Sequence, residues 1–304
     1  MNDLVTDVKS LELETLKNLK SSKAANTLRA YKADFRDFAL FCQQNGFNSM
    51  PSEPKIITLY LTHLSKSSKF STLKRRLASI SVIHKLNGHY LDVKHPIITE
   101  NLLGIRRMKG TYQKAKKPIL INDLKLIIKA INEVKNEKNR LKNKALLLVG
   151  FAGGFRRSEL VAILIDDIEF VSEGVKIFVK RSKTDQSGEG MTKGIPYFSN
   201  PDYCPVIALK NWIKVNQIKS GKIFDMSDRN VALKIKEYAS KAGLDENKYS
   251  GHSLRSGFAT STAELGAEER TIMAMTGHKT TQMVRRYIKE ANLFKNNALN
   301  KIKF

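Results

Sequence analysis

The sequence has few cysteines: its 304 residues include two, Cys42 and Cys204, at a separation that fits no metal-ligand spacing. We interpret both as free thiols, which suits a reducing compartment. The first ten residues lack the basic start and apolar core of a signal peptide, and no apolar run approaches the length of a membrane span. These absences predict a cytoplasmic protein with no membrane contact.

Two further absences exclude nucleotide binding and two-metal catalysis from the expected functions. The chain has no Gly-rich loop of the kind that holds nucleotide phosphates, so bound ATP is not expected. It also has no cluster of carboxylates of the kind that a two-metal nuclease needs. The sequence therefore predicts a protein that uses neither a cofactor nor a metal ion.

Acidic residues are scarce relative to basic ones. Asp and Glu number 29 against 53 Lys and Arg, which gives a formal net charge of +24. A soluble protein this basic usually has an extended polyanionic partner, and nucleic acid is the commonest. An AT-rich genome would also raise the lysine content, but it would not place basic residues beside the motifs described below. We expect a protein that binds double-stranded DNA.

Apolar residues recur at steps of three and four along most of the chain, which predicts a mainly helical protein. Ser71 and Asn122 are expected to be helix N-caps. Between residues 166 and 198 the apolar period becomes two, which predicts a small antiparallel sheet with a polar tip at 183–190. Helices are expected from 22 to 46, over 54–65, from 71, over 99–108, 122–134 and 141–151, from 158 to 164, and over 205–216, 228–242, 252–265, 268–275 and 280–289.

The length and the 41% apolar content suffice for two domains with their own cores. The stretch that ends at Pro118 is basic and poor in apolar residues, so it predicts a linker able to follow a phosphate backbone. We therefore predict a lead-in at 1–21, a helical domain at 22–108, a basic linker at 109–118, a mixed domain at 119–290 and an apolar tail at 291–304.

Several basic residues are candidate phosphate contacts. Lys74, Arg75 and Arg76 crowd the first turn of a predicted helix, where positive charge is unfavourable for the helix dipole. We interpret them as ligands for phosphates, with a merely solvated helix face as the alternative. In and around the predicted linker, the candidates are Arg106, Arg107, Lys109, Lys114, Lys116 and Lys117.

Six residues of the second half of the chain make a set of groups for attacking a phosphodiester without a metal. Arginines can hold non-bridging oxygens bidentately, a tyrosine can act as nucleophile, and histidine and lysine can move protons. The six are Arg156 in Gly-Phe-Arg-Arg-Ser-Glu-Leu (154–160), Lys183 in Arg-Ser-Lys-Thr (181–184), His252 and Arg255 in Gly-His-Ser-Leu-Arg (251–255), His278 in Thr-Gly-His (276–278), and Tyr287.

The surroundings of these residues support the interpretation. Arg156 follows two glycines at a turn between helices, where backbone can approach a phosphate closely. His252 and Arg255 are three residues apart, so they share a helix face and can point at one phosphate. Tyr287 could instead belong to the core, and its phenol, with a pKa of about 10, needs nearby positive charge to attack at neutral pH.

These motifs, in this order and with Tyr287 nine residues after His278, resemble the tyrosine recombinase, or phage-integrase-like, family, of the Xer type or a small integrase. The resemblance covers about 118–290, and the first domain resembles the family's core-binding domain more weakly. It implies a helical core-binding domain joined to an α+β catalytic domain. It also implies cleavage and rejoining of DNA through a 3′-phosphotyrosyl intermediate, by a dimer on each recombination site and a homotetramer overall.

The resemblance also assigns roles to individual residues. It selects Arg156 over its neighbour Arg157 as the catalytic arginine. It implies that Glu159 is a buried acidic partner that holds the site together, the alternative being an acid on a helix surface. Lys183 would be the general acid, with Lys180 and Lys193 as alternatives.

Two questions remain open from the sequence. Related proteins have Trp at the position of His278, so the role of this histidine could be partly one of packing. The tail at 291–304 could pack into a neighbouring protomer or fold back on its own domain.

The rival functions are a type IB topoisomerase, which rejoins the same strand, and a catalytically silent DNA-binding regulator.

Overall fold

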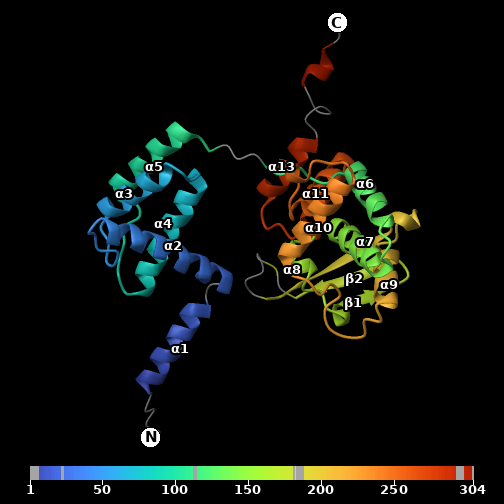
Figure 1. Cartoon of the computed structure of the whole chain (residues 1–304), viewed down its shortest axis with the longest axis horizontal. Coiled ribbons are helices and arrows are strands. Elements are labelled where there is room, and N and C mark those ends of the chain that lie inside the picture. The colour runs from blue at the N-terminus through green and yellow to red at the C-terminus, as the bar shows by residue number, and fades with distance from the viewer. Residues whose placement is uncertain are drawn as a thin grey trace. The chain divides into compact units, whose positions relative to one another are not determined.

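The computed structural model describes residues 7–21, 24–111, 115–180, 182, 188–291 and 298–302. The chain divides into two compact units, an N-terminal unit, Met1–Lys114, and a C-terminal unit, Ala115–Phe304. Both are mainly helical, and a small antiparallel sheet lies in the second, which confirms the predicted fold class (Figure 1).

The N-terminal unit is built from helices. They are α1 (Val8–Ser21), α2 (Ala25–Gln44), α3 (Pro54–Ser65), α4 (Phe70–Leu86) and α5 (Pro96–Lys109). Helices α2 to α5 bury a shared core that includes Phe38, Tyr60 and Ile80. Prolines occupy the first turns of α3 and α5, where the missing N–H has no helical partner to lose.

An ion-pair network ties α4 to α2. Asp34 on α2 is 4% exposed; its carboxylate accepts from Arg75 and Ser79 of α4, and its backbone carbonyl accepts from Nη1 of Arg76 at 3.1 Å. Arg76 also contacts Asp37, with 3.0 Å between Nη1 and Oδ2. Arg75 and Arg76, which the sequence predicts as phosphate ligands, therefore have carboxylate partners inside the unit.

The C-terminal unit combines helices with a three-stranded sheet. Its main elements are α6 (Ile121–Asn132), α7 (Glu137–Ala152), α8 (Arg157–Leu160), β1 (Ile168–Phe170), β2 (Gly174–Val179), β3 (Met191–Pro196), α9 (Pro205–Val215), α10 (Asp228–Lys241), α11 (Ser253–Glu264), α12 (Glu269–Thr276) and α13 (Thr281–Ala291). Short 3₁₀ turns lie at η1 (Ile165–Asp167), η2 (Pro201–Tyr203), η3 (Glu246–Lys248) and η4 (Ala298–Lys301).

The sheet has the order β1-β2-β3 and is antiparallel throughout. Ile177 pairs with Ile168 of β1, and Val175 pairs with Ile195 of β3. The side chains of Val175, Ile177 and Val179 are buried, as the period of two predicts. One face of β2 is therefore part of the core.

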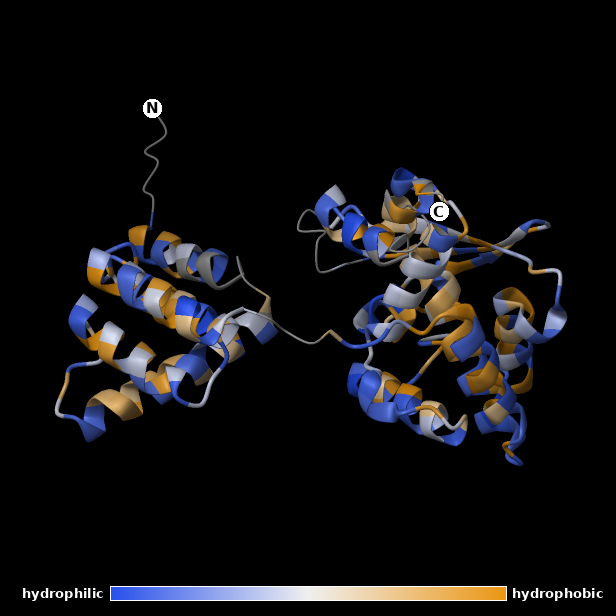
Figure 2. Ribbon diagram, turned by 90° about the horizontal axis from the view of Figure 1, so that it is seen from above, coloured by the Kyte–Doolittle hydropathy of each residue, from blue (hydrophilic) through white to orange (hydrophobic). Residues whose placement is uncertain are grey.

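Helix α7 lies at the centre of the C-terminal unit, and its second half is buried all round. It packs against α9 and α11. Figure 2 colours the helices by hydropathy, and most carry an apolar side and a polar side. Apolar burial is the main term that stabilises such a unit, at roughly 25 cal/mol per Å².

The chain enters the C-terminal unit at a fixed point. The N–H of Lys117 donates to the carbonyl of Lys248 at 2.7 Å, and the N–H of Ile119 donates to Ser253 at 2.9 Å. Gly257 of α11 makes this approach possible, because a Cβ there would lie 1.9 Å from the carbonyl oxygen of Ile119. Residues 117–119 are therefore bound directly to the segment that carries His252 and Arg255.

Some predicted helix ends are wrong. Helix α4 begins at Phe70 and α6 at Ile121, so Ser71 and Asn122 lie inside the first turns and are not N-caps. The residues at the cap positions make no side-chain capping bond. Phe70 packs against the N-terminal core, so tertiary packing outweighs the capping preference of Ser71.

The helix expected over 158–164 is α8 and ends at Leu160. After a turn at Val161 and Ala162, the chain pairs with residues 221–223. Ile223 donates to the carbonyl of Ile163 at 3.0 Å, and Ile165 donates to Gly221 at 2.9 Å. These backbone bonds replace the helical ones. Among the described residues, no helix is both long and apolar enough to cross a membrane.

Candidate active site

Arg156 stands at the N-terminus of α8, just after a glycine turn. Gly154 has a φ of +54°, a left-handed conformation that favours glycine. The Arg156 N–H donates to Oε2 of Glu159 at 2.9 Å, and its Nη1 donates to Oε1 at 2.6 Å. Glu159 is 4% exposed, so it is not an acid on a helix surface.

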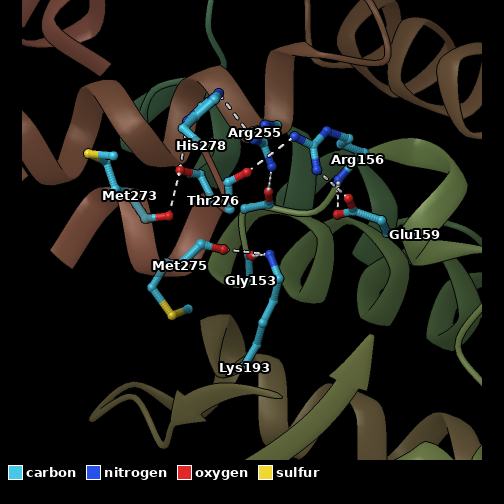
Figure 3. Close-up of polar contacts among 11 residues, drawn as sticks. Gly153, Arg156, Glu159, Lys193, Arg255, Met273, Met275, Thr276 and His278 are labelled. Carbon is cyan, nitrogen blue, oxygen red and sulfur yellow. Dashed lines mark hydrogen bonds and ion pairs between the residues drawn. The ribbon is translucent and has the colours of Figure 1, made fainter. Parts of the chain in front are cut away.

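Arg255 lies in the first turn of α11 and is buried. Its Nη1 donates to the carbonyl of Gly154 at 2.9 Å, and its Nη2 lies 3.1 Å from Nε2 of His278 (Figure 3). His278 follows Gly277, whose φ of +64° ends α12. Arg156 also reaches this turn, because its Nη2 donates to the carbonyl of Gly277 at 3.4 Å. Three predicted site residues from distant segments thus converge.

The cluster is strongly cationic. Burial, followed by the charge of Arg156, lowers the pKa of Arg255 to about 10, so this guanidinium stays charged at neutral pH. Burial, followed by the charges of Arg255, Arg156 and Lys193, lowers the pKa of His278 to about 4, so this imidazole is neutral. The positive potential comes from fixed side chains, which suits an anionic phosphate.

Lys193 is a further member of the cluster, and the sequence identifies it only as an alternative to Lys183. It is 1% exposed, and its Nζ donates to the carbonyls of Gly153 at 2.7 Å and Met275 at 2.5 Å. It joins the turn before Arg156 to the turn before His278 (Figure 3). Burial lowers its pKa to about 8, opposed by the charge of Glu159.

Tyr287 and His252 line one cavity of about 230 Å³. His252 is exposed at the N-terminus of α11, and Tyr287 lies half-buried on α13. The Tyr287 ring centroid is 6.2 Å from that of His278, so the cavity borders the cationic cluster. His252 and Arg255 are close in sequence, but one faces the cavity while the other is buried beside it. Lys116, Arg286 and Ser256 also line the cavity.

The predicted general acid, Lys183, lies outside the described residues. Its two alternatives both have partners: Lys180 forms an ion pair with Asp167 at 2.8 Å, and Lys193 holds the two carbonyls. Arg157, the neighbour that was not selected as the catalytic arginine, packs against Gly251 in the motif that carries His252. Its Cδ would be 1.8 Å from a Cβ at Gly251, so it supports the turn before His252.

The candidate phosphate contacts fall into two groups. Lys74, Arg106 and Lys109 line a cavity of about 680 Å³ at the start of α4 and the end of α5, where Lys66 and Lys69 join them. Lys66 and Lys69 are not among the phosphate contacts predicted from the sequence, although they lie in the basic segment before α4.

In the C-terminal unit, Lys116 and Lys117 have internal partners. The Nζ of Lys116 donates to the carbonyl of Asn247 at 2.5 Å, and that of Lys117 lies 3.0 Å from Oδ2 of Asp123. Arg107 is exposed on α5, and Lys114 lies outside the described residues.

Within the part of the chain that the structure describes, no three His, Cys, Asp or Glu residues group as metal ligands.

Comparisons with known proteins identify the family. The model of the phage integrase family matches residues 119–293. An integrase/recombinase described as a xerD homolog from Selenomonas ruminantium is 41% identical over 316 residues, which cover 99% of this chain and 92% of the relative.

Solved structures share the fold. The XerH site-specific recombinase in a pre-cleavage complex with its difH substrate aligns over 91% of this chain and 79% of its own, with a TM-score of 0.63 and 15% identity. A lambda integrase tetramer bound to a Holliday junction aligns over 99% and 81%, with a TM-score of 0.58 and 17% identity. The chain therefore belongs to the phage integrase family and is a tyrosine site-specific recombinase.

Proposed function

We propose that the chain recombines specific double-stranded DNA sites, with Tyr287 as the nucleophile. The observation that supports this most is the position of Tyr287: it shares a cavity with His252 and lies beside the cluster of Arg156, Arg255 and His278. A phosphate in this cavity would meet fixed cations on one side and the phenol on the other. Fixed charges of this kind are usually the largest catalytic term.

The proposed reaction is two successive transesterifications. The Oη of Tyr287 attacks the phosphorus, the bond to the 5′ oxygen breaks, and Lys183 gives that oxygen a proton. His252 takes the proton from the phenol. The 5′ hydroxyl of the partner duplex then attacks the 3′-phosphotyrosyl bond and releases Tyr287. The link conserves the bond energy, so neither a metal nor a nucleotide is consumed.

The arginines are proposed to bind the non-bridging oxygens. Arg156 and Arg255 are held by Glu159 and by the carbonyl of Gly154, so their charges are in place before DNA binds. Preorganised donors need no rearrangement during the reaction. This division of labour leaves proton transfer to His252 and Lys183.

The proposed assembly is a dimer on each site and a tetramer on two sites. The lambda integrase structure on a Holliday junction is such a tetramer for that protein. In this chain the tail at 291–304 is proposed to contact a neighbouring protomer. Leu299 and Ile302 of the tail are exposed, while Leu293, Phe294 and Phe304 lie outside the described residues.

The test is strand exchange without metal. Purified protein is incubated in EDTA with two labelled duplexes that carry the recombination site, and with a supercoiled plasmid that carries one site. We expect recombinant strands and a protein linked to a DNA 3′ end. Relaxed plasmid with no strand exchange would indicate a topoisomerase, and a requirement for Mg²⁺ would indicate a nuclease.

Binding is expected to depend steeply on salt, because of the +24 net charge. The logarithm of the affinity should fall with the logarithm of salt concentration with a slope of about −5 or steeper, at about −0.9 for each neutralised phosphate. Lys74→Gln should make the slope shallower by about one unit. Lys241→Gln should not, because Lys241 is ion-paired with Glu237. Fluorescence anisotropy over a salt series measures both, and equal slopes in the two variants would remove Lys74 from the DNA interface.

A further inference from the structure

Thr276 joins the active-site cluster through its hydroxyl, although no motif role is assigned to it. It is the last residue of α12 and is fully buried. Its Oγ1 donates to the carbonyl of Ile272 at 2.6 Å and lies 2.7 Å from Nδ1 of His278. On the other side of the imidazole, Nε2 lies 3.1 Å from Nη2 of Arg255.

Arg255 and the carbonyl of Ile272 stand at the two ends of this row of hydrogen bonds. Their chemistry fixes the direction of each bond between them. A guanidinium only donates, so Nε2 of His278 must accept from Arg255 and carry no proton. A carbonyl only accepts, so the single hydroxyl proton of Thr276 points at Ile272. The Thr276 oxygen must then accept from Nδ1, which therefore carries the proton. His278 is neutral, in its Nδ1–H tautomer.

This tautomer has a consequence for Arg255. The guanidinium is held at two nitrogens, by Nε2 of His278 and by the carbonyl of Gly154. With the proton on Nε2 instead, two donors would face each other, and Arg255 would lose one of its two holds. The orientation of a buried charged group thus depends on which imidazole nitrogen is protonated.

Packing ties Thr276 to the same place. A Cβ on Gly154 would lie 3.2 Å from the Cγ2 methyl of Thr276. The methyl therefore rests against the turn that precedes Arg156, while the hydroxyl serves His278. Valine would keep this methyl contact and remove only the hydroxyl, whereas serine would keep the hydroxyl and remove the methyl.

We propose that Thr276 is a positioning residue: it accepts the Nδ1 proton of His278 and so stabilises the tautomer whose Nε2 holds Arg255 in its orientation toward the phosphate. This proposal rests on the proposed function in one respect, the expected effect on the rate of phosphotyrosyl formation. The tautomer itself can be measured in the protein without DNA.

The experiment compares wild type, Thr276→Val, Thr276→Ser and the control Thr262→Val. Thr262 is a helical threonine of the same unit, and its hydroxyl also donates to the carbonyl four residues earlier, that of Phe258, at 2.8 Å. Long-range ¹H–¹⁵N spectra of ¹⁵N-labelled protein report each histidine tautomer, and the signal missing from His278→Gln assigns residue 278. The rate of phosphotyrosyl formation is measured in a single turnover.

Wild type, Thr276→Ser and Thr262→Val are expected to give the Nδ1–H form from pH 8 to 5.5. Thr276→Val is expected to shift signal to the Nε2–H form and to slow cleavage by about 10- to 100-fold, with DNA binding unchanged. A wild-type His278 that is Nε2–H, or protonated at pH 6, would overturn the proposal even if the valine variant failed to fold.

Two other outcomes separate the proposal from the proposed function. A folded Thr276→Val protein with a changed tautomer and an unchanged cleavage rate overturns the positioning role. A wild-type protein that forms no adduct at all, while Thr276→Val still changes the tautomer, counts against the proposed function and supports the assignment of Thr276 to His278.

Discussion

Tyr287→Phe protein is expected to bind its DNA site with unchanged affinity and to form no covalent adduct. The substitution removes one oxygen from a half-buried ring, so the contact with His278 and the packing of α13 remain. The reaction loses its nucleophile, and cleavage should fall on the order of 10⁴-fold or more. Denaturing electrophoresis of labelled DNA measures the adduct, and a mobility shift measures binding.

The matched control is Tyr203→Phe. Tyr203 is another partly buried tyrosine of the C-terminal unit, and it lies in η2, away from the cavity of Tyr287. Its loss of a hydroxyl should leave cleavage unchanged. An adduct that still forms in Tyr287→Phe, or one that disappears in both variants, would show that Tyr287 is not the nucleophile.

Glu159→Gln is expected to destabilise the C-terminal unit by about 3 kcal/mol, the low end of the range for breaking a buried ion pair. Both carboxylate oxygens accept from Arg156, one from its backbone and one from its guanidinium. Glutamine offers one acceptor and places an NH₂ group against the second donor. Removal of the negative charge also leaves Arg255 and Lys193 without the carboxylate that favours their charged forms.

Urea unfolding followed by tryptophan fluorescence isolates this effect. The chain has one tryptophan, Trp212, which is buried in α9 and so reports the C-terminal unit. Glu237→Gln is the control, because Glu237 contacts two lysines, each at 2.8 Å, on the surface of α10. It should change stability by at most about 1 kcal/mol. Equal effects of the two substitutions would mean that Glu159 is not an essential buried partner.

The motifs place much of the site, because the residues of a motif are neighbours in sequence. Arg156 and Glu159 lie within one helical turn of each other, and the sequence predicts both as site residues. The contacts between motifs are different. Lys193 bonds to Met275, which lies 82 residues away, and no periodicity or spacing encodes that meeting. The sequence therefore offers Lys193 only as one of three lysines.

Thr276 illustrates a second limit. In sequence it is one residue of Thr-Gly-His, and its hydroxyl is indistinguishable from that of any helical threonine. Its role follows from the fold, because Gly277 turns the chain so that His278 lies back against the end of α12. Helix existence was predictable from apolar spacing, whereas caps such as Ser71 were not, because packing against the core decided where α4 begins.

The fixed entry of the chain at Lys117 limits the length of the connection between the two units. Helix α5 ends at Lys109, so residues 110–116 form the whole tether, which can span at most about 25 Å. Once one unit is bound, the other is confined near the same duplex. Short tethers give effective concentrations in the millimolar range, about 10²- to 10⁴-fold gains in avidity without any new contact. Under the proposed function, two surfaces of modest individual affinity would therefore hold one recombination site together.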